Sequence, residues 1–102
     1  MNIVSIYNDR TRYSLTASFD GGALVLSGQD LSPGLEEMFG RDEYEYWYRV
    51  DDVPRVCAEL GATTDTLFAR VKELLASHGI SASTRWKEWL IEKQIPYKFS
   101  NY

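Results

Sequence analysis

Residues 12–27 read RYSLTASFDGGALVLS, and this stretch decides the fold class. From Tyr13 to Phe19, apolar side chains alternate with small polar ones, which is the period of a strand with one buried face and one wet face. The Asp-Gly-Gly sequence at 20–22 predicts a hairpin turn, because glycine adopts positive φ without steric cost. Residues 23–27 supply the returning strand.

Further strands and helices are expected on both sides of this hairpin. Aromatic and β-branched residues predict strands at 3–7, 43–50 and 95–99. Apolar residues at helical spacing predict a helix at 53–60 closed by Gly61, a longer helix that starts at 67 and is closed by Gly79, and a third helix at 84–93 capped by Ser81 or Ser83. Gly28 is expected to leave the sheet, and Ser32-Pro33 to open a short helix that ends near Phe39-Gly40.

Strands come first and helices follow, which is the pattern of an α+β protein. We therefore expect one domain covering residues 1–102. It should hold a mostly antiparallel sheet of about four to five strands, with about two to three helices packed on one face.

Composition and length are those of an ordinary globular protein. The chain has 102 residues, of which 44% are hydrophobic and 25% charged. No apolar run is long enough for a membrane span, and the N-terminus lacks the pattern of a signal peptide. Cys57 is the only cysteine, which favours a reducing compartment. A cytoplasmic protein that does not bind membranes is the expectation.

Negative charge is concentrated in one segment. The formal net charge is −4, but residues 30–52 alone hold eight acidic and two basic residues, a local charge of −6. This distribution argues against direct binding of nucleic acid. It favours a protein partner with a basic surface, because clustered charge raises association rates.

Residue types that carry chemistry are sparse. Cys57 and His78 are each alone, whereas zinc sites combine three or four such ligands, so no metal site is predicted. No nucleophile motif, phosphate loop or dinucleotide fingerprint is present, so no catalytic residues, no cofactor and no enzymatic activity are predicted. The remaining catalytic alternative is a carboxylate-based hydrolase in which Asp30 meets Glu43 or Glu45.

The most informative motif is EYEYWYRV at 43–50. As a strand, it places the three tyrosines on one face and Glu45, Trp47 and Arg49 on the other. Tyrosine and tryptophan dominate binding hot spots, although one of these faces must belong to the core. The other face then carries carboxylates beside aromatic rings.

Short motifs along most of the chain resemble a family of small bacterial proteins of unassigned biochemical function. These motifs are Gly28-Gln29-Asp30-Leu31, Phe39-Gly40, Tyr44-Glu45-Tyr46-Trp47, Trp89-Leu90 and Ile95-Pro96-Tyr97. Some members are similar to immunity proteins of polymorphic or contact-dependent growth inhibition toxin systems. The resemblance implies a bacterial cytoplasmic protein and carries no catalytic residues with it.

These observations predict an immunity protein that binds and neutralises a cognate toxin domain with a basic surface, for example a nuclease. The predicted interface residues are acidic except for one tryptophan: Asp30, Glu36, Glu37, Asp42, Glu43, Glu45 and Trp47. The oligomeric state stays open between monomer and homodimer. The main alternative is a homodimeric accessory domain that associates through a sheet edge or an aromatic face.

Overall fold

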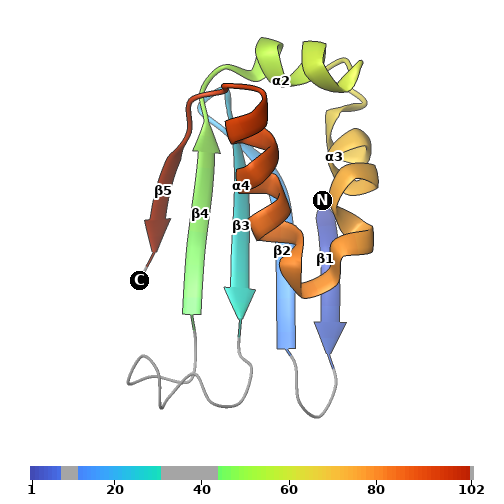
Figure 1. Ribbon diagram of the computed structural model, residues 1–102, viewed down its shortest axis with the longest axis vertical. Helices are drawn as coiled ribbons and strands as arrows, with labels where there is room; N and C mark the ends of the chain where they lie inside the picture. Colours follow the sequence, from blue (N-terminus) through green and yellow to red (C-terminus); the bar gives the residue numbers. More distant parts are fainter. Residues whose placement is uncertain (8–11, 31–43, 102) are drawn as a thin grey trace.

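The computed structural model describes residues 1–7, 12–30 and 44–101. Within these ranges, five antiparallel strands form one sheet whose strand order follows the sequence (Figure 1). The strands are β1 (Asn2–Tyr7), β2 (Arg12–Asp20), β3 (Ala23–Asp30), β4 (Tyr44–Val50) and β5 (Lys98–Asn101). The expected α+β fold is confirmed.

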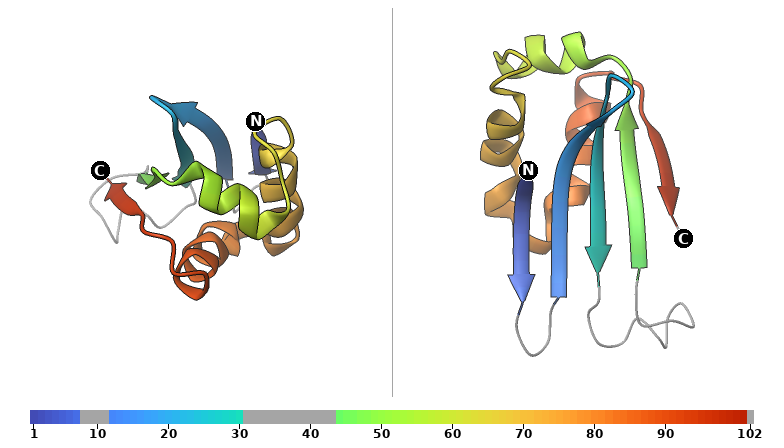
Figure 2. Two further views of the ribbon diagram at one scale, coloured as in Figure 1. Left: turned by 90° about the horizontal axis from the view of Figure 1, so that it is seen from above. Right: turned by 180° about the vertical axis from the view of Figure 1, so that it is seen from behind.

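Helices of the described ranges pack together on one side of this sheet (Figure 1, Figure 2). They are α2 (Val53–Leu60), α3 (Leu67–Leu75), the 3₁₀ helix η1 (Ala76–Ser81) and α4 (Ala82–Glu92). The first helix has the predicted bounds, the second ends at Leu75 rather than at Gly79, and the third begins two residues earlier than expected. The helix expected after Ser32-Pro33 lies outside the described residues.

Both ends of α2 follow from its sequence. The carboxylate of Asp52 accepts a hydrogen bond from the backbone N–H of Arg55 at 3.2 Å, which satisfies a free donor of the first turn. Gly61 ends the helix in the left-handed conformation, with φ of 63°, as the sequence predicts. The helix therefore starts and stops through local chemistry.

The passage from α3 to α4 is less regular than expected. Gly79 has φ of 55° and lies inside η1, which joins the two α-helices directly. Ser81 occupies the position before α4, but its side chain makes no capping hydrogen bond. The chain turns here through the glycine backbone, so serine capping is not what starts α4.

Gly28 does not leave the sheet, which corrects the sequence-based expectation. β3 continues through Gly28 to Asp30, and Gly28 pairs with Tyr46 of β4. A Cβ atom at position 28 would overlap the ring of Tyr46, which covers this glycine. The glycine provides room for an aromatic ring from the next strand rather than a turn.

The last strand also begins later than expected. The sequence places it at 95–99, whereas β5 spans Lys98–Asn101 and Pro96 precedes it. Ile95 is buried in the core, and β5 forms one edge of the sheet. Proline has no N–H for a ladder, so pairing starts only after it.

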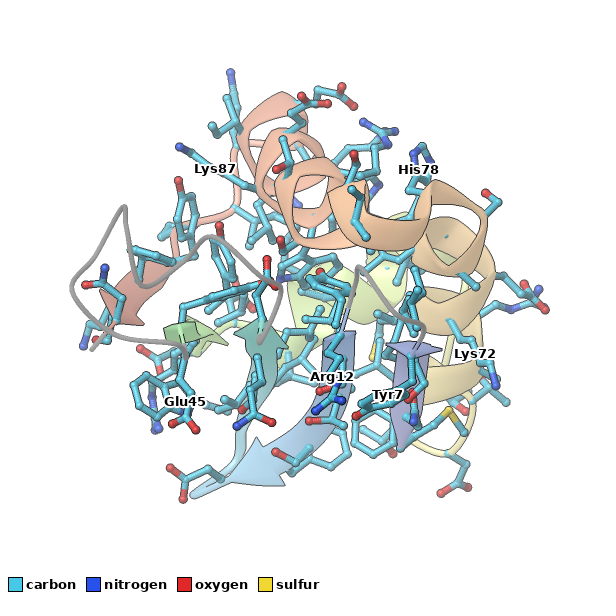
Figure 3. All side chains as sticks on the ribbon, turned by 90° about the horizontal axis from the view of Figure 1, so that it is seen from below. Tyr7, Arg12, Glu45, Lys72, His78 and Lys87 are labelled. Carbon is cyan, nitrogen blue, oxygen red and sulfur yellow. The ribbon has the colours of Figure 1, made fainter. Side chains whose placement is uncertain are left out.

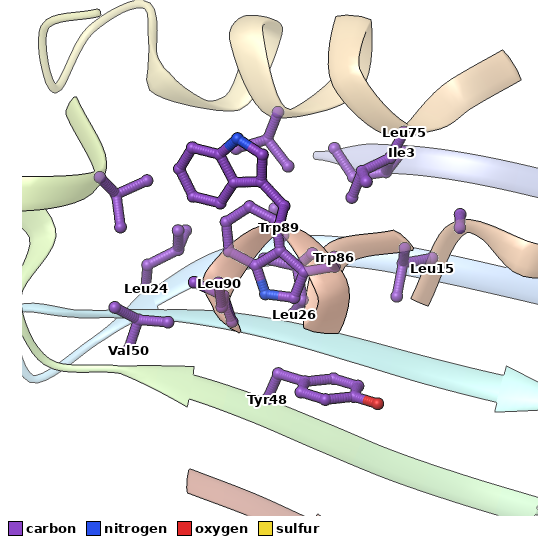
Figure 4. Close-up of a cluster of buried hydrophobic side chains, with 14 of the residues drawn as sticks. Ile3, Leu15, Leu24, Leu26, Tyr48, Val50, Leu75, Trp86, Trp89 and Leu90 are labelled. Carbon is purple, nitrogen blue, oxygen red and sulfur yellow. The ribbon is translucent and has the colours of Figure 1, made fainter. Parts of the chain in front are cut away.

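The core fills the space between the sheet and the helices (Figure 4). Trp86 and Trp89 of α4 stack with ring centroids 5.3 Å apart and planes 11° from parallel. The largest fully buried side chains are Trp86, Leu15, Leu24, Leu26, Leu67, Leu75, Leu90, Val50, Val56 and Val71. They come from the inward positions of β2, β3 and β4 and from all three α-helices. Burial of this apolar surface is the main stabilising contribution.

Candidate functional site: the open face of the sheet

The side of the sheet away from α2, α3 and α4 is referred to here as the open face. Figure 2, seen from behind, shows the strands in front of the helices on this side. Strand register places these side chains on it: Ser5, Tyr7, Arg12, Ser14, Thr16, Ser18, Val25, Ser27, Gln29, Glu45, Trp47, Arg49, Lys98 and Ser100. Serine and threonine are the commonest residues among them.

Trp47 is the largest side chain on the open face. It lies in a row across the sheet with Thr16, Ser27 and Ser100, so its neighbours in register are hydroxyl groups. The side chain is half-buried rather than enclosed. The indole lines two separate depressions of this face.

A depression of about 310 Å³ lies on one side of Trp47. Its lining consists of Ser14, Thr16, Ser27, Gly28, Gln29, Glu45, Tyr46 and Trp47. The hydroxyl-bearing residues are short, whereas Glu45 and Trp47 are long. The depression is therefore a consequence of side-chain length on neighbouring strands.

The carboxylate of Glu45 is held in place by an amide. Gln29 Nε2 donates a hydrogen bond to Glu45 Oε1 at 2.9 Å, and the two residues are paired in register. Figure 3 shows Glu45 on the opposite side of the molecule from His78 and Lys87 of the helical layer. A carboxylate offers about four lone-pair sites, so this bond leaves acceptor capacity toward solvent.

A second depression, of about 380 Å³, lies on the other side of Trp47 and has a different charge pattern. Arg49 donates to Asp20 at 2.9 Å and to Asp51 at 3.1 Å, and Lys98 lies 3.9 Å from Asp51. Hydrogen bonds to Asp51, which has the larger effect, and to Asp20 raise the pKa of the Arg49 guanidinium. Two acids and two bases thus balance at this end of the sheet.

The described acidic residues of the segment 30–52 do not share one surface. Asp30 follows Gln29 in β3, so its side chain points to the opposite face of the sheet from Glu45. Asp51 and Asp52 lie beyond the other end of β4, where Asp51 is ion-paired and Asp52 caps α2. Glu45 is the one member of this described group on the open face beside Trp47.

Four predicted interface residues, Glu36, Glu37, Asp42 and Glu43, lie outside the described residues. Of the predicted set, the structure brings Glu45 and Trp47 together and separates Asp30 from both. The partners that complete the site, above all Gln29 and Ser27, were not predicted. Alternation along β3 places Ser27 and Gln29 on one face of the strand. It identifies them as neighbours of Trp47 and Glu45 only once the register between β3 and β4 is known.

Tyr46 and Tyr48 of β4 belong to the core rather than to the open face. Tyr46 and Tyr48 are buried under the helices, and the hydroxyl of Tyr46 donates to that of Tyr13 at 3.2 Å. Burial raises the pKa of Tyr46 above its ordinary value. The sequence-based expectation that one aromatic face is structural is confirmed for Tyr46 and Tyr48.

The carboxylate alternative loses one of its two pairings. Asp30 and Glu45 lie on opposite faces of the sheet, so they do not form a two-carboxylate site. Within residues 1–7, 12–30 and 44–101, no group of three or more potential metal-binding side chains comes together. Cys57 is buried against the core, and His78 is exposed in η1.

Two apolar features were also missed from the sequence. Phe99 of β5 packs against Tyr48 at 4.9 Å between ring centroids, yet 46% of its surface stays exposed. Phe19 contacts Phe68 at 4.8 Å and borders a groove of about 670 Å³ at the tip of the β2–β3 hairpin. The groove is otherwise lined by Gly22, Val53, Pro54, Cys57, Ala58, Ala62, Thr63 and Thr64.

Comparison of the chain with protein-family models, with curated proteins and with solved structures finds no match. None of the helices in the described ranges has the length and apolar character needed to cross a membrane.

Proposed function

We propose that this protein binds another protein through its open face, and that the partner is a cognate bacterial toxin domain that it neutralises. The observation that carries the proposal is Trp47: a half-buried indole on a sheet face that no helix of the described ranges covers. Tryptophan is enriched at the energetic centres of interfaces. A half-buried indole among small polar side chains is the expected form of such a centre.

The size of the open face suits a specific interface. Five strands about 4.8 Å apart and about seven residues long give a projected area of roughly 20 by 23 Å. A standard interface buries about 800 Å² of accessible surface on each partner, which is more than this projection of about 450 Å². A partner would therefore cover the whole face and part of its rim.

The chemistry of the face suits docking rather than catalysis. Ser14, Thr16 and Ser27 lose little side-chain entropy when they are covered, and their hydroxyls can donate or accept hydrogen bonds. Glu45 adds one negative charge beside the indole. A surface of this kind can be buried by a rigid partner at a small ordering cost.

A toxin is proposed as the partner because of charge and resemblance. The chain carries a net charge of −4, and the segment 30–52 carries −6. Toxins that act on nucleic acid present basic surfaces, to which an acidic protein associates rapidly. The short motifs quoted above resemble those of small bacterial proteins that include immunity proteins.

Co-expression with the toxin-like product of the adjacent gene tests this proposal. The wild-type chain should rescue growth and co-purify with that product. Ser27→Arg places a bulky charge on the open face and should abolish both effects. The matched variant Ser77→Arg changes an exposed serine of η1 on the helical side and should retain both. Equal behaviour of the two variants, or no rescue by the wild type, would reject the proposal.

A second candidate is self-association through β5. All four residues of this edge strand are exposed, and Phe99 is among them. Exposed sheet edges are templates for pairing with another strand. Sedimentation equilibrium at micromolar concentration separates the candidates: a dimer that Phe99→Ser dissociates supports self-association, and a monomer removes it.

A further inference from the structure

We infer that the depression between Glu45 and Trp47 is a receptor site for one arginine side chain of the partner. This inference rests on the proposed function, since it names the group that the partner brings to the open face. The depression has an acidic wall, an aromatic wall and a floor of hydroxyl groups. A guanidinium is the common side-chain group that complements all three.

The spacing of the two walls fits a planar cation. Glu45 and Trp47 are two residues apart on β4, so their Cα atoms are separated by about 6.6 Å along the strand. A guanidinium can lie over the face of an indole through a cation–π contact while its edge donates to a carboxylate. A lysine ammonium group can pair with the carboxylate of Glu45, but it lacks the flat surface that stacks on the indole of Trp47.

Glu45 is oriented for such a contact and is not matched by a cation of the described part of the protein. Gln29 holds Oε1 at 2.9 Å, which fixes the carboxylate without neutralising it. Among the ion pairs of the described residues, none includes Glu45, whereas Asp20 and Asp51 on the far side of Trp47 are paired with Arg49. Among the described residues, the first depression therefore keeps a net negative charge, and the second does not.

The floor supplies further acceptors. A guanidinium carries five N–H donors, and a carboxylate edge satisfies two of them. The hydroxyl oxygens of Ser14, Thr16 and Ser27 line the depression and can accept others. The volume of about 310 Å³ is on the order of ten times the roughly 30 Å³ that one water molecule occupies in the liquid. The depression therefore has room for a side chain.

The positive charge of Arg12 on the same face weakens the site without closing it. Arg12 is exposed near the start of β2, two strands from Glu45 and one row further along. Standard sheet spacings separate their Cα atoms by about 12 Å, which exceeds the Debye length of about 8 Å at physiological ionic strength. Salt therefore screens the repulsion between Arg12 and a partner arginine, and the attraction between that arginine and Glu45 is the larger of the two.

The test uses the full chain and titrates it with N-acetyl-arginine amide, followed through the indole N–H signals in NMR spectra. The Trp47 signal should shift and saturate, and those of the buried Trp86 and Trp89 should not move. The citrulline amide has nearly the same shape without the charge and should cause a much smaller shift. Glu45→Gln should weaken arginine binding about tenfold or more, as expected for loss of a charge-assisted hydrogen bond.

The control variant is Glu88→Gln, which removes an exposed carboxylate from α4 on the other side of the molecule. It should bind the arginine amide as the wild type does. No saturable shift, equal shifts from arginine and citrulline, or equal loss in both glutamine variants would overturn the inference.

The two proposals fail in different ways. If the wild-type chain captures the toxin but Glu45→Gln binds it equally well, the arginine site is wrong and the interface stands. If the arginine amide binds at Trp47 while no toxin is captured, the site stands as a guanidinium site and the immunity role is rejected.

Discussion

Replacing Gly28 by alanine should destabilise the fold by about 2–4 kcal/mol. The added methyl group would overlap the Tyr46 ring, so either the ring or the β3–β4 ladder must move. Overpacking costs about 1–3 kcal/mol, and loss of the 3.2 Å hydrogen bond from Tyr46 to Tyr13 adds about 1 kcal/mol. For a domain of this length, the melting temperature should fall by roughly 10–25 °C.

Urea denaturation measures this cost, with the midpoint lowered and the slope unchanged. Ser27→Ala, one position away on the open face, is the matched control and should change stability by less than about 1 kcal/mol. The reasoning also requires coupling, because shortening Tyr46 to valine removes the ring atoms that the added methyl group would meet. A Gly28→Ala cost that stays the same in the Tyr46→Val background would refute ring overlap as the cause.

Two further predictions concern single side chains. Burial raises the pKa of Tyr46, so above about pH 10 the unfolded chain releases a proton that the folded chain keeps, and stability falls as pH rises. Tyr46→Phe should therefore make stability decline less steeply between about pH 10 and 12 than in the wild type, measured by urea denaturation at each pH. Asp52→Ala should cost about 1 kcal/mol, because it removes the cap of α2, whereas alanine in place of the exposed Asp65 should cost much less in the same assay.

Sequence periodicity predicted the elements well where neighbours along the chain determine them. The alternation from Tyr13 to Phe19 and the glycine turn gave the β2–β3 hairpin, and Gly61 correctly marked the end of α2. The expectation at Gly28 was wrong because its role depends on a ring 18 positions later in the sequence. No local pattern contains that contact.

The candidate site was predictable only in part, because local alternation gives the face of a side chain but not its partners on the next strand. Alternation in β4 correctly put Glu45 and Trp47 on one face and Tyr46 and Tyr48 on the other. Asp30 was grouped with them by charge, although it faces the other way, and Gln29 was overlooked although it holds Glu45. A shift of one residue along a strand exchanges the two faces, so a count of charges cannot replace the register.

The central claim is that the open face binds the partner with Trp47 at its centre, and calorimetric titration of the purified toxin tests it most directly. Trp47→Ala should weaken binding by about 2 kcal/mol or more, or roughly 30-fold, as for other interface hot spots. Ile91→Ala removes a side chain that is 57% exposed on α4, and it should bind as the wild type does. Wild-type affinity in the Trp47 variant, or an equal loss in both, would contradict the claim.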